Sequence, residues 1–372
     1  MKFGIGILGA TGYIGVPYRN EIRECPNEGR VVALCARRMD RLEAAGKEDS
    51  AELVTQDWRA VVEHPEVDLV MVLTPDALHV EPVLAAAELG KHVFCEKPIG
   101  KNVAEAHKMC QAVESRGLLN FVPFWTRYVP AFRRAKQLVA EGKLGEIRGV
   151  IYRWHNPRPL STPFTWRDDP ELSAAGSIAD VGSHAYDLMR FVLGDEAKRV
   201  LVHATSMMPP KADLGDVDLN EAIAWGSGNS TSASKQQRKG TSPDFAQIAF
   251  EFQSGCAGHL TVSHASYIRK GFAPELELHG TKGSLSVDRI TGELLFADSP
   301  DPATQLEVVT DDGFCNRFAT HVFPALAQQA SGKETEHPTM RDGLRTQVFT
   351  DAALASAQRG AWVELSEFDT EG

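Results

Sequence analysis

The segment from Lys91 to Lys101 has a residue pattern suited to chemistry beside a nucleotide. Its apolar residues 92–95 predict a buried parallel strand, which would deliver Lys97 at the carboxyl end of that strand. In open α/β sheets ligands bind beyond the carboxyl ends of the strands, and Pro98 keeps Lys97 out of helical dihedrals. Lys97 is therefore a candidate to face a bound nucleotide. The alternative is a surface Glu-Lys pair that ends a strand.

A second segment, residues 176–187, combines one histidine with two carboxylates. Asp180, His184 and Asp187 fall at i, i+4 and i+7, which is one face of a predicted helix. A histidine between carboxylates on a rigid helix is suited to general acid or base catalysis. One alternative is an ionic cluster on a helix surface. A zinc site would need a further Cys or His at ligand spacing, so we expect no metal.

The elements that would position these residues differ between the two parts of the chain. Strand and helix patterns alternate over the first 120 or so residues, and the strands are almost continuously apolar, which predicts a parallel sheet covered on both faces. We therefore expect an α/β fold with a doubly wound sheet in residues 1–124. The expected strands are Phe3–Leu8, Val31–Cys35, Leu69–Leu73, His92–Cys95 and Leu119–Val122, with helices over Val80–Leu89 and Val103–Ser115.

Strand patterns follow one another after about Ile147, and helices become few. This predicts an α+β domain with a mostly antiparallel sheet over residues 125–372. Residues 208–243 are polar and are expected to form a long loop or insertion. The expected strands are Ile147–His155, Val200–Ser206, Phe245–Phe252, Gly258–His264, Leu276–Leu278 and Leu285–Val287, with helices over Ile178–Leu193, Phe318–Ala330 and Leu344–Ala357.

Composition excludes several classes of partner. The 372 residues include 39 Lys+Arg against 50 Asp+Glu, a formal net charge of -11. Nucleic acids and anionic membranes need a basic face, so neither is expected as a partner. No apolar run approaches the length of about 18 residues that spans a membrane, and the start has no signal-peptide layout. Six scattered cysteines favour a reduced, cytoplasmic protein.

The first predicted strand ends in a glycine-rich turn over residues 9–15, Gly-Ala-Thr-Gly-Tyr-Ile-Gly. Glycines let phosphates approach the amino end of the following helix, where free N–H groups favour anions. The spacing is G-x-x-G-x-x-G and not the common G-x-G-x-x-G, so Thr11 or Gly12 must serve as the second glycine. A plain strand–helix turn is the alternative. The residues expected at the phosphates are Gly9, Thr11, Gly12, Tyr13 and Ile14.

The end of the second predicted strand indicates which dinucleotide binds. Folds that select NAD usually carry Asp or Glu about 20 residues past the glycines. Here Ala36 stands in that region and Arg37 and Arg38 follow. Guanidinium groups suit a 2′-phosphate, so NADP is predicted, with NAD as the second choice. The alternative is that both arginines are solvated ends of a strand.

Other residues are expected to border the cleft. Thr74, Pro75 and His79 would lie near the cofactor, as would Glu96, although His79 has the simpler interpretation of a helix start. Aromatic faces pack on sugar C–H groups and arginines donate to hydroxyls, so two Trp–Arg combinations are candidate pocket walls. The alternative is packing between domains. These candidates are Trp125 with Arg127 and Trp166 with Arg167.

These motifs together resemble the Gfo/Idh/MocA family of oxidoreductases. The resemblance rests on T-P with a later His79, on G-K-H-V-x-C-E-K-P over 90–98, on D-x-G-x-H-x-x-D, and on the segment His279–Leu285. It implies a Rossmann domain and a second domain whose open sheet often packs on another subunit, hence a homo-oligomer (dimer or tetramer). The run Ser173–Gly176 departs from the Gly-Gly-Gly common in the family, and the 208–243 segment is unusual in length.

The resemblance also implies the chemistry. Lys97, Asp180 and His184 match the family's catalytic positions, where a sugar or cyclic polyol exchanges a hydride with the nicotinamide. His184 would be the base toward the substrate hydroxyl, Lys97 would stabilise charge on that oxygen and Asp180 would bind a second hydroxyl. Whether Lys97 or His184 transfers the proton stays open. Two other hypotheses are a redox-neutral enzyme with tightly bound NAD(P) and a non-catalytic NADP-binding sensor.

Overall fold

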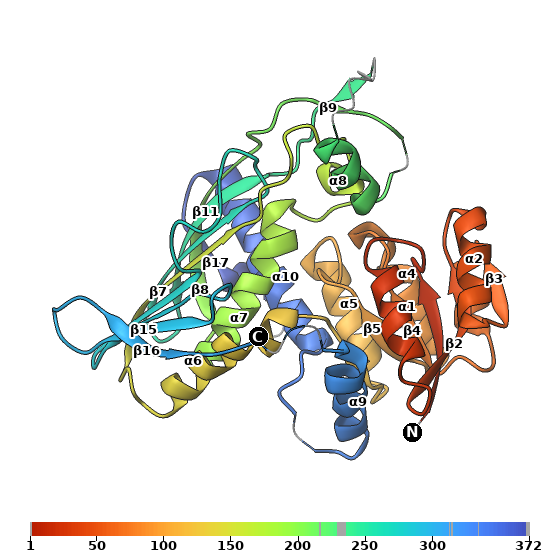
Figure 1. The fold of residues 1–372 in the computed structure, drawn as a ribbon, viewed down its shortest axis with the longest axis horizontal. Coiled ribbons are helices and arrows are strands. Elements are labelled where there is room, and N and C mark those ends of the chain that lie inside the picture. Colours follow the sequence, from red (N-terminus) through yellow and green to blue (C-terminus); the bar gives the residue numbers. More distant parts are fainter. Residues whose placement is uncertain are drawn as a thin grey trace.

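The structure is a computed structural model that describes residues 2–215, 217–228, 236–311, 313, 315–333 and 335–369. Two sheets lie side by side, with helices α7 (Ser183–Leu193) and α10 (Met340–Arg359) between them (Figure 1). Helix α10 contacts α5 (Val103–Glu114) of the N-terminal half and β8 (Ala197–Thr205) of the large sheet. In the part of the chain that is described, no helix is long and apolar enough to cross a membrane.

The N-terminal sheet confirms the predicted doubly wound arrangement. Its six strands are all parallel and have the order β3-β2-β1-β4-β5-β6, so the chain reverses direction across the sheet between β1 and β4. The turns after these strands therefore meet at one edge. The strands are β1 (Phe3–Leu8), β2 (Gly29–Cys35), β3 (Leu53–Thr55), β4 (Leu69–Val72), β5 (His92–Cys95) and β6 (Asn120–Phe121), and the further helices are α1 (Gly15–Arg23), α2 (Met39–Asp49), α3 (Trp58–Glu63) and α4 (Val80–Glu88).

The second sheet has nine strands in the order β16-β15-β14-β13-β7-β12-β11-β8-β17. Every neighbouring pair is antiparallel except β7 with β12, which confirms the mostly antiparallel prediction. Three outer strands of this sheet, β15, β16 and β17, were not expected from the sequence. The remaining bounds are β7 (Ile147–His155), β11 (Phe245–Phe252), β12 (Ala257–Ser263), β13 (Leu276–Gly280), β14 (Ser284–Val287), β15 (Glu293–Ala297), β16 (Thr304–Val308) and β17 (Val363–Glu364).

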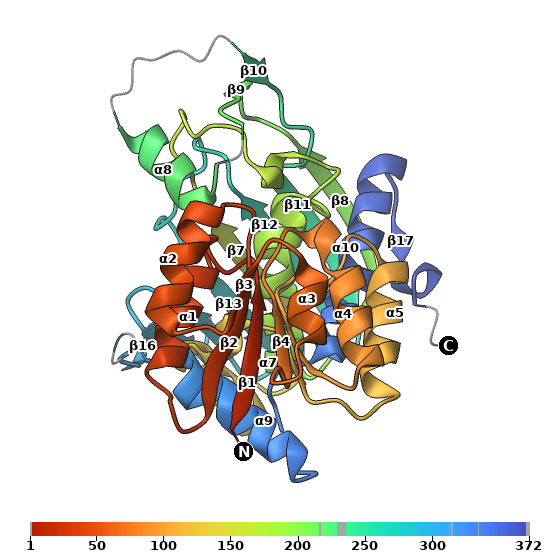
Figure 2. The ribbon, with the colours of Figure 1, turned by 90° about the vertical axis from the view of Figure 1, so that its right-hand side faces the viewer.

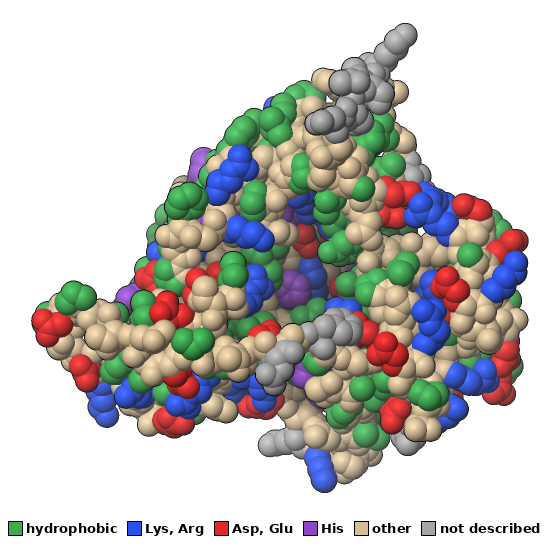
Figure 3. Space-filling view, in the orientation of Figure 1, with side chains coloured by type: hydrophobic (Ala, Val, Ile, Leu, Met, Phe, Trp, Pro, Cys, Tyr) green, Lys and Arg blue, Asp and Glu red, His purple; other side chains and the backbone are tan. Residues whose placement is uncertain are grey.

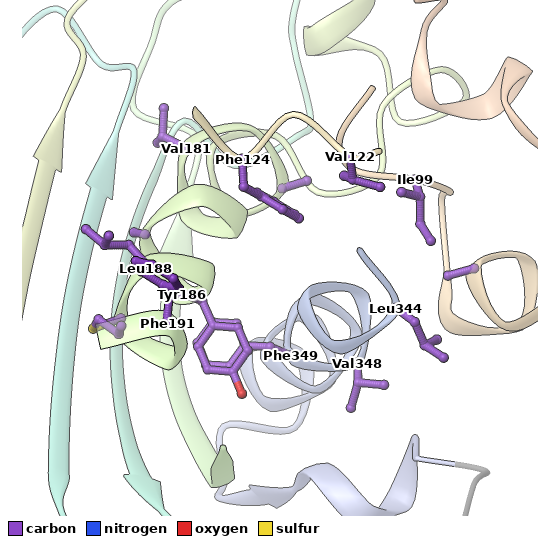
Figure 4. Close-up of a cluster of buried hydrophobic side chains, with 14 of the residues drawn as sticks. Ile99, Val122, Phe124, Val181, Tyr186, Leu188, Phe191, Leu344, Val348 and Phe349 are labelled. Atoms are coloured by element: carbon purple, nitrogen blue, oxygen red, sulfur yellow. The ribbon is translucent and has the colours of Figure 1, made fainter. Parts of the chain in front are cut away.

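Aromatic packing fixes the helices that stand between the sheets. The predicted helix over 178–193 forms as a π-helical turn, Ile178–Gly182, followed by α7. Tyr186 of α7 stacks on Phe349 of α10 with ring centroids 3.9 Å apart, inside the buried cluster of Figure 4. The π turn directly precedes α7, and His184 is the second residue of that helix.

The C-terminal segment also completes the core of the N-terminal half. A π-helical turn (Phe318–Val322) and helix α9 (Phe323–Ala330) pack against the first sheet. Phe318 lies against Phe94 and Tyr18, and Phe323 stacks on Phe3. The division of the chain at residues 124 and 125 stays a prediction, since residues beyond 300 contribute to both halves.

The polar segment 208–243 contains regular structure that the sequence pattern did not indicate. Strands β9 (Lys211–Ala212) and β10 (Gln237–Arg238) pair with each other, and α8 spans Leu219–Ser227. A reciprocal capping box starts α8, because Asp218 accepts from the Glu221 N–H and Glu221 accepts from the Asp218 N–H. Figure 2 shows α8 close to α2. Residues 216 and 229–235 of this segment lie outside the described part.

Candidate active site

A cavity of about 930 Å³ opens where the carboxyl ends of the first sheet face the second domain. Figure 3 shows the hollow, in which basic, acidic and histidine side chains come together. Predicted residues from both halves line it together with the start of α8. Those that line it are Gly9, Thr11, Gly12, Tyr13, Ile14, Arg37, Arg38, Thr74, Pro75, Glu96, Lys97, Trp125, Trp166, Arg167, Asp180 and His184.

The glycine turn is shaped to receive phosphate groups. Gly9 has φ +84°, and a Cβ there would lie 2.5 Å from the Leu73 carbonyl oxygen. A Cβ on Gly15 would collide with the Gly9 carbonyl oxygen, so both positions require glycine. Helix α1 starts at Gly15 after Ile14, and no side chain caps its N–H groups. This turn fits the pyrophosphate of a dinucleotide.

The arginines after β2 face carboxylates that come from α8. Arg38 Nη1 donates to both carboxylate oxygens of Glu221, at 3.0 and 3.1 Å. Arg41 Nη1 donates to Asp218 Oδ2 at 2.9 Å, and its Nη2 contacts Glu221 as well. Arg38 and Arg41 line the cavity on one side and Asp218 lines it opposite them. Carboxylates of the segment 208–243 therefore pair with arginines at the end of β2 and the start of α2.

His79 does not line the cavity. Its ring is fully buried, with Nε2 2.8 Å from the Thr74 carbonyl oxygen and Nδ1 3.1 Å from that of Pro98. Burial lowers the pKa of His79, although the hydrogen bonds to these carbonyl oxygens act in the opposite direction. His79 thus holds the Thr74 turn against the Lys97–Pro98 turn. We predicted this residue beside the cofactor, and the structure instead places it behind the cavity wall.

Lys97 and Asp180 join the two halves of the molecule across the cavity. Lys97 Nζ donates to Asp180 Oδ1 at 2.8 Å and to the Asp180 carbonyl oxygen at 2.9 Å. Burial alone would raise the pKa of Asp180, but Lys97, His264 and Arg167 outweigh it and hold that pKa well below its usual range. Asp180 is consequently a carboxylate at any working pH, and it can accept a hydrogen bond from a substrate hydroxyl.

His184 lies beside this pair in an aromatic setting. Its ring stacks near Trp154, with centroids 5.6 Å apart, and meets Phe124 edge-on. Burial and then Lys97 lower the pKa of His184 well below its usual value, although Asp180 acts in the opposite direction. Within the described residues Nδ1 has no hydrogen-bond partner. A neutral imidazole at this place can accept a proton.

Glu96 and Trp125 are linked through a buried tyrosine. Trp125 Nε1 donates to the Tyr18 hydroxyl at 2.8 Å, and that hydroxyl donates to Glu96 Oε1 at 2.8 Å. Burial raises the pKa of Glu96, while Lys97 lowers it. Tyr18 was not identified from the sequence, because it looks like an ordinary apolar position of α1. Its contacts fix the indole of Trp125 at the cavity wall.

Asp187 and Arg127 lie away from the cavity, which corrects two expectations. Arg127 Nε and Nη2 donate to the two Asp187 oxygens at 2.7 and 2.6 Å, and Nη2 also reaches Asp342 Oδ1 at 2.6 Å. The Arg127 side chain is 7% exposed and that of Asp187 is fully buried. This pair fastens α7 to α10 and to the turn after β6. Arg127 is therefore a packing residue and not a pocket wall, and Asp187 does not flank His184.

Two residues around Asp180 were missed by the sequence reasoning, and one of them, Arg158, lines the cavity. Arg158 Nη2 donates to Asp180 Oδ2 at 3.4 Å, and His264 Nε2 lies 3.1 Å from the same oxygen. Arg167 Nε approaches it to 3.7 Å. Arg158 follows β7 in Asn156–Pro159, and His264 ends a predicted strand, so position at a strand end was the available signal. In the described ranges no three His, Cys, Asp or Glu side chains gather as a metal site would require.

Comparison with known proteins supports this arrangement. A family model described as oxidoreductase family, NAD-binding Rossmann fold, matches residues 3–124, and one described as GFO/IDH/MocA C-terminal domain matches residues 132–286. Levoglucosan dehydrogenase of Pseudarthrobacter phenanthrenivorans is 26% identical over 335 residues, with 84% of each chain covered. Myo-inositol 2-dehydrogenase of Thermotoga maritima is 26% identical over 286 residues, covering 77% of this chain and 75% of that one.

The fold is also found among solved structures. An oxidoreductase domain protein from Kribbella flavida superposes with a TM-score of 0.82 at 28% identity. The match covers 98% of this chain and 99% of that one. The two-sheet fold is therefore shared over nearly the whole length of both chains.

Replacing Arg127 tests its structural role. Arg127→Ala leaves Asp187 buried without its main partner, so the free energy of unfolding should fall by about 3–5 kcal/mol. Urea unfolding followed by circular dichroism measures this change. Arg167→Ala is the control. Asp180 keeps its ion pair with Lys97 in that variant, so the free energy of unfolding should fall far less. Equal losses in the two variants would contradict the packing role.

Proposed function

Because the chain belongs to the Gfo/Idh/MocA family of oxidoreductases, we propose that it transfers a hydride between NADP and a hydroxyl or keto carbon of a sugar or cyclic polyol. It is an NAD(P)-dependent enzyme that acts on CH–OH groups. The contact between Lys97 and Asp180 beside His184 carries the proposal, since it sets an acid–base group next to the nucleotide cavity. The relatives named above act on levoglucosan and myo-inositol and favour neither a redox-neutral enzyme nor a sensor.

The side chains divide the proton chemistry between them. During oxidation, neutral His184 takes the proton of the substrate hydroxyl. Lys97 donates a hydrogen bond to the same oxygen and stabilises its developing negative charge, and Asp180 accepts from a neighbouring hydroxyl. A bound oxidised nicotinamide would supply the acceptor for the hydride that leaves the carbon. The aromatic rings of Trp125 and Trp154 border this place and limit access of water.

The cofactor would lie along the first sheet. The N–H groups around Tyr13 and Ile14 would hold the pyrophosphate, and Thr74 and Pro75 would border the nicotinamide side. At the adenosine end, Arg37 and Arg38 would receive the 2′-phosphate that makes NADP the preferred dinucleotide. Glu221 contacts Arg38 there, so a phosphate must share or replace that carboxylate.

Substitution of the proton-handling residues tests the proposed catalysis. Lys97→Met and His184→Asn should each lower kcat about a hundredfold or more, as expected for loss of an acid–base group. The dissociation constant of the dinucleotide, measured by calorimetry, should change little. Normal turnover in both variants would place the active site elsewhere. Lys136→Met is a suitable control, since Lys136 pairs with Glu336 outside the cavity.

The pH profile tests the proton acceptor. The pKa of His184 is lowered, so the base is already neutral at pH values where an ordinary histidine, of pKa about 6.5, is half protonated. The ratio kcat/KM for oxidation should therefore show no loss attributable to a histidine between about pH 8 and about pH 6.5, and should fall only at lower pH. An acid limb centred near pH 6.5 would contradict the assignment.

Cofactor titrations test the role of the arginines. Arg38→Ala should weaken NADP binding about tenfold or more and affect NAD much less, because it removes a charge-assisted hydrogen bond of about 1.5–3 kcal/mol. Glu221→Gln should instead tighten NADP, since the guanidinium groups lose their competing carboxylate. Calorimetry with both dinucleotides measures these changes. Glu81→Gln is the control, a cavity glutamate that pairs with Arg59.

The NADP proposal would be contradicted if the protein bound NAD more tightly than NADP and if Arg38→Ala changed the dissociation constant of neither dinucleotide. The hydride-transfer proposal would stand, because it depends on the other end of the cavity.

A further inference from the structure

Three cationic side chains converge on one carboxylate at the substrate end of the cavity. Lys97, Arg158 and Arg167 all approach the one carboxylate of Asp180. His264, the fourth group on that carboxylate, is neutral: burial and then Arg158 lower its pKa to about 4, although Asp180 opposes the shift. Glu96, another carboxylate of the cavity wall, interacts with Lys97. Arg158 and Arg167 thus share the carboxylate of Asp180 with Lys97 in a partly buried place, which is costly unless a further anion joins them.

Arg158 is the most buried of these cations. Its side chain is 9% exposed, and within the described residues its guanidinium group makes one hydrogen bond, the 3.4 Å contact with Asp180. A guanidinium group has five N–H donors. The loop nevertheless holds the residue firmly, since its N–H donates to the His264 carbonyl oxygen and its own carbonyl accepts from Ser266. The group is thus pre-positioned at the cavity wall with donors to spare.

The neighbouring carboxylates do not neutralise Arg158 and Arg167. Asp168 is paired with Lys211 at 2.6 Å, and Asp169 with Arg238 at 2.7 Å. Burial raises the pKa of Asp76 to about 7, so this acid is only partly charged at neutral pH. Among the described residues, the carboxylates nearest Arg158 and Arg167 are thus paired with other cations or only partly charged, although Asp168 still interacts with Arg158.

We infer that the substrate is a sugar or polyol that carries a carboxylate, and that Arg158 and Arg167 bind this group. The planar carboxylate matches the guanidinium fork. A neighbouring hydroxyl would donate to Asp180, and the carbon to be oxidised would lie at Lys97 and His184. The carboxylate takes no part in the reaction: the hydride leaves the hydroxyl-bearing carbon and the hydroxyl proton goes to His184. The inference rests on the proposed function, of which it names the substrate class.

Matched acids and amides test the inference directly. The enzyme saturated with reduced dinucleotide is titrated by calorimetry with D-glucuronate, D-galacturonate and D-mannuronate, each beside its uronamide. Each pair differs in one charge. At least one acid should bind about tenfold or more tightly than its amide, the effect of a charged hydrogen bond. Amides that bind as well as the acids throughout would overturn the inference.

Two variants locate the preference. Arg158→Gln should reduce the amide-to-acid ratio of dissociation constants at least about fivefold, and Arg167→Gln serves if that protein does not fold. Arg153→Gln is the matched control on the preceding strand, where Arg153 pairs with Glu277, and it should keep the ratio. If Arg158→Gln instead weakens the dinucleotide and keeps the ratio, the anion of Arg158 is the cofactor pyrophosphate and the inference is wrong.

Turnover separates the inference from the proposed function. The same three acids and the corresponding aldoses are assayed with oxidised dinucleotide. Oxidation of aldoses and acids with equal kcat/KM would overturn the inference and leave the proposed function standing. Tighter binding of an acid, with no oxidation of any of these compounds or of inositols, would leave the anion site standing and count against the proposed function.

Discussion

The ion pair between Lys97 and Asp180 is the contact on which the site depends. It joins the end of β5 in the first sheet to the π-helical turn before α7 in the second domain, at 2.8 Å. The two side chains are only 12% and 22% exposed, so each needs the other to offset its loss of water. At Asp180, burial raises the pKa and the ammonium group of Lys97 is the largest of the effects that outweigh it. At His184, burial is the main cause of the lowered pKa, and Lys97 adds to it by disfavouring a second positive charge.

The two halves are held in register by buried groups below this pair. Arg127, Asp187 and Asp342 form one ionic cluster that connects three elements. The aromatic rings of Tyr18 and Phe318 attach the C-terminal segment to the first sheet. Both clusters are buried and connect elements on either side of the cavity, and they therefore help to hold the two halves at the close spacing that hydride transfer requires.

Charge is distributed unevenly over the molecule. The chain has a formal net charge of -11, yet both ends of the cavity gather guanidinium groups. Arg38 and Arg41 lie at the nucleotide end, and Arg158 and Arg167 at the substrate end. A basic cleft in an acidic protein concentrates small anions without attracting polyanions. Helix α8 completes the nucleotide end, and its carboxylates moderate the positive charge there.

What the sequence by itself determined was the local part of the architecture. The strand periodicity, the glycine turn, Lys97 before Pro98 and the spacing of Asp180 and His184 were all readable, because each depends on neighbours within a few residues. Tertiary structure alone decided that Asp187 turns to Arg127, that Arg158 and His264 join Asp180, and that Glu221 meets Arg38 across 183 positions of the chain. These side chains pair through space with residues that are distant in the sequence. The partner is selected by the electrostatic cost of leaving a buried charge unpaired, and this cost produces no periodic pattern in the sequence.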